Sequence, residues 1–146
     1  MTPQSWNHLP GRTVVAALLA VAALVPHGAH SQADLLDGKV FITTEGDPGK
    51  PASLDSVVTF GEGKFHNKAC DQWGYGKGEV KAVRDSDVIR FEAETRSDRY
   101  GTRQVWKGAI RGDSIEGTRI MYPKPGFFSP NPEPKESWFK GAVRPN

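Results

Sequence analysis

The chain has 146 residues, with 19 basic and 17 acidic side chains, four histidines and a single cysteine. This near-neutral balance of scattered charges argues against nucleic acid or anionic membranes as partners. A single cysteine cannot form an internal disulfide, so packing must supply the stability of the fold.

The first 33 residues have the features of a cleavable secretory signal peptide. Arg12 is the only charged side chain before Asp34, and the apolar run of residues 13–25 follows it. That run is too short for a membrane-spanning helix, which needs about 20 residues, and no cysteine follows it to carry a lipid anchor. We therefore predict cleavage after Ala33, export to the periplasm or out of the cell, no stable membrane anchor, and one domain over residues 34–146. The alternative is a buried apolar helix of that domain.

Short segments of alternating apolar and polar residues follow, and none has apolar residues at helical spacing. We expect strands over residues 39–44, 56–60, 64–67, 78–84, 87–96, 102–111, 114–122 and 136–144. Tight turns are expected at residues 61–63, 85–86, 99–101 and 112–113, where glycine or small polar residues cluster.

The segment from Asp87 to Met121 indicates how these strands pack. Its first strand places Ile89, Phe91, Ala93 and Thr95 on one face and charged residues on the other. Because a one-sided meander must hide its apolar face, we expect an all-β domain: an eight-stranded, up-and-down antiparallel meander closed into a barrel. A two-sheet β-sandwich is the alternative.

Glycines lie inside three of the predicted strands, at Gly108, Gly117 and Gly141. Glycine normally weakens a strand, so its presence needs a reason. The glycines allow the sharp coiling of a small barrel or leave interior space for a ligand, and both could hold at once.

Three segments carry a resemblance to a known kind of protein. They are the pattern from Trp106 to Thr118 (W-x-G-x-I-x-G-D-x-I-x-G-T), the closing Trp138-Phe139-x-Gly141 and the segment of residues 69–76. The first two resemble calycin-type, lipocalin-like small barrels of exported bacterial proteins, and the third looks like its counterpart in uncharacterised periplasmic proteins of this kind. The resemblance implies a lipocalin-like barrel, a fold that hosts carriers, inhibitors and occasional enzymes.

Few residues are suited to catalysis or metal binding. His66, Cys70 and Asp71 are too few for a closed zinc site, and we predict neither a metal nor a cofactor. We expect Cys70 to be a small buried residue near the barrel end, with an intermolecular disulfide or a reactive thiol as alternatives. His66 and Cys70 lack an orienting partner, and Glu92 and Glu94 lie on the wet face of a strand. We therefore expect no enzyme.

Two loops carry the functional prediction. Residues 73–76 place Trp73 and Tyr75 between glycines, and residues 123–134 contain five prolines with Phe127 and Phe128. The two phenylalanines either plug the barrel end or form a lid or partner surface.

We predict an exported barrel that binds a small, mainly apolar molecule without catalysis. The interior would be lined by Phe91, Trp106, Ile110 and Ile115, and the rim by Trp73, Tyr75, Phe127 and Phe128. Arg119 falls on the apolar face, where a charge needs a ligand carboxylate, a bulge or exposure at the strand end. The alternatives are a filled barrel that contacts an envelope protein, with a homodimer also considered, and thirdly an enzyme of unknown chemistry.

Overall fold

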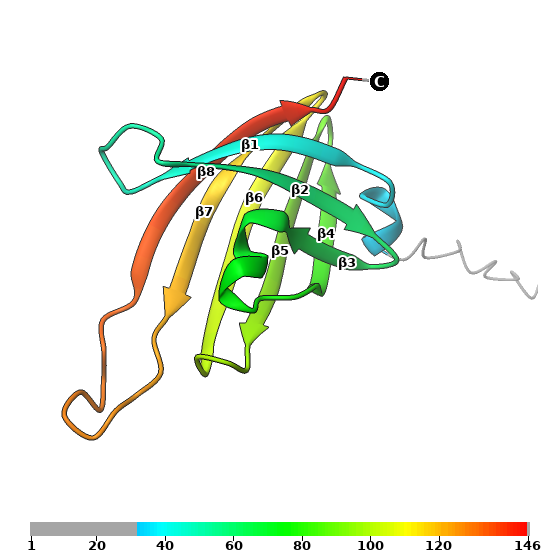
Figure 1. Ribbon diagram of the computed structural model, residues 1–146. Helices are drawn as coiled ribbons and strands as arrows, with labels where there is room; N and C mark the ends of the chain where they lie inside the picture. Colours follow the sequence, from blue (N-terminus) through cyan, green and yellow to red (C-terminus); the bar gives the residue numbers. More distant parts are fainter. Residues whose placement is uncertain (1–31, 146) are drawn as a thin grey trace, which may run out of the picture.

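The computed structural model describes residues 32–145, in which eight antiparallel strands close into a barrel (Figure 1). The strands are β1 (Val40–Gly46), β2 (Leu54–Gly61), β3 (Lys64–Asn67), β4 (Gly78–Asp85), β5 (Val88–Ser97), β6 (Thr102–Arg111), β7 (Ser114–Tyr122) and β8 (Lys135–Val143). Each strand pairs with the next, and β8 closes the barrel on β1, from Phe41 opposite Val143 to Gly46 opposite Trp138. The predicted up-and-down barrel is confirmed, and the sandwich alternative is wrong.

Two short 3₁₀ helices accompany the strands: η1 (Gln32–Leu35) before β1 and η2 (Lys68–Trp73) between β3 and β4. Neither has the length that produces a helical pattern in the sequence. No helix within residues 32–145 has the length and apolar character needed to span a bilayer. The predicted signal peptide lies outside the described residues, except for its last two residues, which begin η1.

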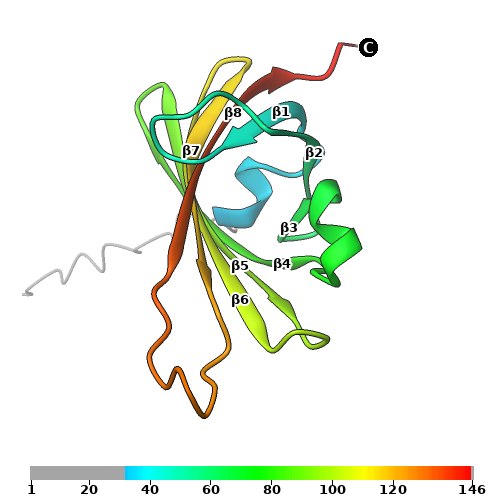
Figure 2. The same ribbon diagram turned by 60° about the vertical axis from the view of Figure 1, so that its left-hand side comes forward.

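The two ends of the barrel differ in their connections. At the closed end, tight turns join β2 to β3, β4 to β5 and β6 to β7, with positive φ at Glu62, Gly63, Ser86 and Gly112. The chain after η1 also lies against this end, where Leu36 is buried and Gly38 N–H donates to Phe60 O. At the open end, longer segments join the strands: residues 47–53, 68–77, 98–101 and 123–134. The last of these, the β7–β8 loop, extends past the ends of the neighbouring strands (Figures 1 and 2).

Aromatic rings fill the closed-end half of the interior. Neighbouring rings lie 4.9–6.3 Å apart between centroids, within the range of favourable aromatic contact, and belong to Phe41, Phe60, Phe65, Phe91, Trp106 and Phe139. Added Cβ atoms at Gly108 and Gly117 would each lie 2.6 Å from one of these rings. The strand glycines therefore make room for rings and for close strand approach, and the expectation that they leave ligand space is wrong.

Candidate functional site

Polar side chains occupy the interior above the aromatic half, towards the open end. We call the polar layer the connected set Glu45, Ser56, Asn67, Arg119 and Ser137. Apart from the partly buried Arg119, all of its members are buried. They project inward from β1, β2, β3, β7 and β8, so closure of the barrel brings together residues that lie far apart in the chain.

One side of the polar layer is a hydrogen-bonded relay. The backbone N–H of Ala69 donates to Ser56 Oγ at 3.0 Å, and Ser56 Oγ donates to Asn67 Oδ1 at 2.7 Å. Asn67 Nδ2 then donates to Glu45 Oε1 at 2.5 Å. The relay fixes one carboxylate oxygen of Glu45 and ties it to the start of η2.

The other side of the polar layer is the guanidinium of Arg119. Its Nη1 lies 3.0 Å from Glu45 Oε2, and the side chains of Arg119 and Glu45 are 16% and 2% exposed. Its Nη2 donates to Ser137 Oγ at 3.1 Å, and its Cζ lies 5.4 Å from the centroid of the Trp106 ring. Arg119 is thus paired with a carboxylate of its own chain, within a regularly paired stretch of β7 and with its side chain 16% exposed, so a bulge or exposure at the strand end is wrong. A role towards a ligand carboxylate stays a prediction.

Two atoms of this ion pair lack a hydrogen bond. Glu45 Oε2 and Arg119 Nε are both buried, and within residues 32–145 neither has a partner in hydrogen-bond geometry. The close Oε2–Nη1 approach is therefore an ion pair without a well-directed hydrogen bond. Buried polar atoms without partners are rare in folded proteins, and bound water or a ligand is a common explanation.

Burial also changes the titration of the groups beside Arg119. Desolvation raises the pKa of Glu45, while the charge of Arg119 and the hydrogen bond from Asn67 lower it in part. Burial, with a smaller contribution from the charge of Glu45, raises the pKa of Cys70 to about 11. The Cys70 thiol is therefore protonated at neutral pH and is a poor nucleophile.

Two adjoining cavities open above the polar layer, with volumes of about 440 and 450 Å³. Asp47, Trp73, Arg119 and Ser137 line both of them. Glu45 borders the first cavity, and the second has a wall that includes Tyr75, Tyr100 and Met121. We call them the mouth cavities: a polar floor with partly aromatic walls, each within the size range of small-molecule sites.

The structure separates the predicted site residues into three groups. Trp73, Tyr75 and Arg119 line the mouth cavities. Phe91, Trp106, Ile110 and Ile115 are interior residues, as expected, but they belong to the filled half and border neither cavity. Phe127 and Phe128 are 94% and 97% exposed, so the alternative in which they plug the barrel end is wrong.

Glu45 is central to the polar layer, but it was not among the residues predicted for the site. The alternation Phe41, Thr43, Glu45 places it on the inward face of β1, but the expected strand ended at Thr44. Asn67, Gln104 and Ser137 lie inside expected strands, but they were not recognised as interior site residues, because alternation was followed only through apolar side chains. A continued alternation through Glu45 is the signal that could have found it.

His66 and Cys70 point to different surroundings. His66 Nε2 lies 2.7 Å from Asp71 Oδ1, whereas Cys70 Sγ accepts a long contact of 3.8 Å from Arg119 Nη1 in the interior. Over residues 32–145, no three His, Cys, Asp or Glu side chains are grouped so that they could hold a metal ion. His66 and Cys70 do not contact each other and therefore do not form a pair of nucleophile and base.

Cys70→Ser should leave the oligomeric state unchanged. The side chain of Cys70 is 1% exposed, so a disulfide between chains would require it to leave the interior. Serine keeps the size and supplies an acceptor for Arg119, so we expect a loss of about 1–2 kcal/mol at most. Urea unfolding measures the stability, and non-reducing electrophoresis measures any dimer. A dimer lost on substitution would instead show that the thiol links chains.

A further hollow lies on the outer face of β4–β8, with a volume of about 1120 Å³. Its floor includes Gly108 and Gly117, which have no side chains. Several of its charged side chains pair with one another, as in Lys107–Glu92 at 3.3 Å and Arg111–Glu116 at 3.0 Å. It is an open depression with solvated charges, and the mouth cavities are the better candidate because unpartnered buried polar atoms lie at their floor.

Comparisons of the chain with protein-family models, curated proteins and solved structures find no match.

Proposed function

We propose that this chain is an exported barrel that binds a small, uncharged amphipathic molecule at its open end without transforming it. The observation that carries the proposal is the Arg119 side chain at the floor of both mouth cavities, whose buried Nε has no hydrogen-bond partner within residues 32–145. An acceptor oxygen on a ligand would supply the missing hydrogen bond. The aromatic walls would take the apolar part of the same molecule.

The zero net charge of the Arg119–Glu45 pair at the floor of the mouth cavities favours a ligand whose polar group is uncharged. An ionised Glu45 cancels the charge of Arg119, so the polar layer offers hydrogen bonds without a net charge. A carboxylate or sulfonate head would add a second negative charge beside a buried one, which is costly in a poorly solvated site. An amide or alcohol head carries no such cost, and this refines the expectation of a mainly apolar ligand.

Export and the likeness to lipocalin-like barrels are part of this proposal. The apolar run of residues 13–25 supports export, and the sequential order of the eight strands supports the likeness. The raised pKa of Cys70 supports binding rather than thiol chemistry. The alternative of a protein-interaction module draws on the exposed Phe127 and Phe128.

Calorimetric titration with three ten-carbon probes tests the proposal: decanamide, decanol and decane sulfonate. At pH 7.5 we expect the amide and the alcohol to bind about tenfold more tightly than the sulfonate, because only the sulfonate brings a charge. The sulfonate stays ionised at acidic pH, and its affinity should rise as pH falls through the raised pKa of Glu45. The affinity for the amide should not change with pH.

Matched variants locate the binding site. Tyr100→Ala removes a half-exposed ring from the cavity wall and should weaken amide binding by about tenfold. The double variant F127S/F128S removes two exposed rings that border neither cavity and should bind the amide normally. If the wild type binds none of the three probes, the proposal is wrong. Tighter binding of the sulfonate at pH 7.5 would show that the head is anionic.

A further inference from the structure

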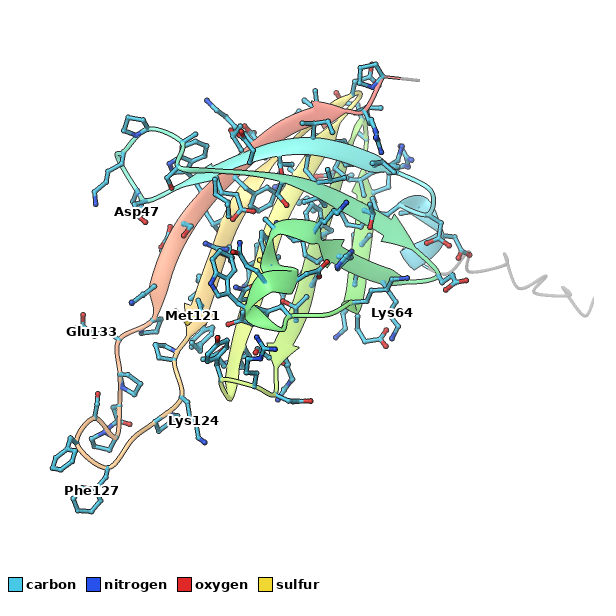
Figure 3. The ribbon with its side chains drawn as sticks, in the orientation of Figure 1. Asp47, Lys64, Met121, Lys124, Phe127 and Glu133 are labelled. Atoms are coloured by element: carbon cyan, nitrogen blue, oxygen red, sulfur yellow. The ribbon has the colours of Figure 1, made fainter. Side chains whose placement is uncertain are left out.

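The β7–β8 loop ends in an exposed apolar tip. Phe127 and Phe128 are 94% and 97% exposed, and the next most exposed large apolar side chain among the described residues is Val83 at 54%. Their ring centroids lie 5.1 Å apart in an edge-to-face arrangement. Figure 3 shows Phe127 at the far end of the loop, pointing away from the barrel. We call residues 125–130 the Phe tip.

Part of the backbone of the Phe tip is hydrogen-bonded within the loop. Gly126 N–H donates to Ser129 O at 2.9 Å, and Ser129 N–H donates to Gly126 O at 3.2 Å. Pro125 and Pro130 flank this turn and have no N–H group. The chief obstacle to placing a loop in an apolar phase is its unpaired backbone groups, and the turn reduces their number.

The shape and charge of the tip fit a bilayer better than a protein. A stable protein interface buries about 800 Å² on each partner, whereas this tip offers two rings on a narrow stem away from the barrel. The charges at the base of the loop and at the start of β8 sum to zero. Lys124 and Lys135 are positive, and Glu133 and Glu136 are negative. Attraction between the tip and a bilayer would therefore come from burial of apolar surface, and phenylalanine is one of the residues with which interfacial protein segments enter the headgroup region.

We infer that the Phe tip inserts reversibly into the surface of a lipid bilayer. The loop leaves the barrel at its open end, so insertion turns the mouth cavities towards the lipid. The contact is peripheral and needs no anchor, and it does not depend on the proposed ligand. Because it is driven by apolar burial, it requires no anionic lipid and resists salt.

Co-sedimentation with phosphatidylcholine vesicles tests this inference, using the protein of residues 34–146. We expect the wild type to partition to the vesicles, equally in low and high salt and equally when anionic lipid is added. F127S/F128S should reduce the partition coefficient by at least about tenfold, because the rings supply the apolar surface. The control I42S/V83S removes two exposed apolar side chains from the barrel wall and should leave partitioning unchanged.

Three results would overturn the inference: no vesicle binding by the wild type, normal binding by F127S/F128S, or binding that needs anionic lipid and is lost in salt. A concentration-dependent dimer that disappears in F127S/F128S would assign the tip to contact between two copies of the chain. The melting temperature of F127S/F128S should equal that of the wild type, since both rings are exposed. Titration of the same variants with decanamide should give the wild-type affinity. Failure of the bilayer inference can then be distinguished from failure of the proposed ligand site.

Discussion

Arg119→Met is expected to lower the free energy of unfolding by about 3–5 kcal/mol at neutral pH, the usual cost of removing one partner of a buried ion pair. The substitution leaves the Glu45 carboxylate, whose side chain is 2% exposed, without a counter-charge. Methionine has a similar length and packs against apolar neighbours, so the loss of charge is the main change. Urea unfolding measures the effect.

The loss should shrink as the pH falls. Desolvation already raises the pKa of Glu45 and the charge of Arg119 opposes that rise, so removing Arg119 raises the pKa further. Between the unfolded pKa and this higher folded pKa, the native state holds more protons than the unfolded state. Stability therefore increases as the pH falls through that window. A loss that grows on acidification would contradict the assignment of Glu45 as the buried partner.

The double substitution E45Q/R119M is the matched control. Glutamine keeps the acceptor for Asn67 and removes the charge, so no buried ion is left without a partner. We expect the double variant to recover most of the stability that Arg119→Met loses, because buried ion pairs contribute little net stability over neutral replacements. The recovered variant should not bind decanamide by the proposed mode, which would separate the role of the pair in binding from its role in folding.

Gly141→Ala is expected to destabilise the barrel by more than about 4 kcal/mol or to prevent folding, which is a large effect for a single methyl group. An added Cβ would lie 2.0 Å from Ile42 O and 2.8 Å from Thr43 Cα. Both atoms belong to the backbone of β1, which pairs with β8 to close the barrel. Neither can move aside without opening that pairing.

Thermal unfolding and size-exclusion chromatography of Gly141→Ala and Gly61→Ala test this expectation. Gly61 also lies in a strand, but an added Cβ meets no atom within 4 Å and its φ is not positive. We expect Gly61→Ala to change stability by less than about 1 kcal/mol. A Gly141→Ala variant as stable as the control would show that β1 and β8 separate without cost.

The barrel could be predicted because period-two alternation survives along most of the chain. The expected bounds of β3, β6 and β7 agree with the structure residue for residue, and their turns contain glycine or acidic residues. η2 could not be predicted, since six residues of 3₁₀ helix leave no repeating apolar pattern. Tight turns and alternating strands depend on residues that are neighbours in the chain, so they can be predicted from short stretches of sequence.

The polar layer could not be predicted in the same way. Arg119 was recognised as an inward charge, but its partner Glu45 lies on another strand, and only closure of the barrel brings β1 and β7 within reach of each other. The exposure of Phe127 and Phe128 depends on the path of a proline-rich loop, which the sequence does not fix. The prediction succeeded for single strands and failed for contacts across the interior.

The described part of the chain enters and leaves the barrel at the same end, and this limits the ways in which the barrel can be attached to a support. η1 enters at the closed end, and β8 leaves at the same end after Val143, opposite Phe41 of β1. A linker fused after residue 145 would therefore attach the protein to a bead, sensor chip or carrier domain by the side opposite the mouth cavities. The three long connections of the open end, residues 47–53, 68–77 and 123–134, would face the solution, where their sequences could be varied while the tight turns stay fixed. The molecule thus has the geometry of a display scaffold, with attachment and variable surface at opposite poles.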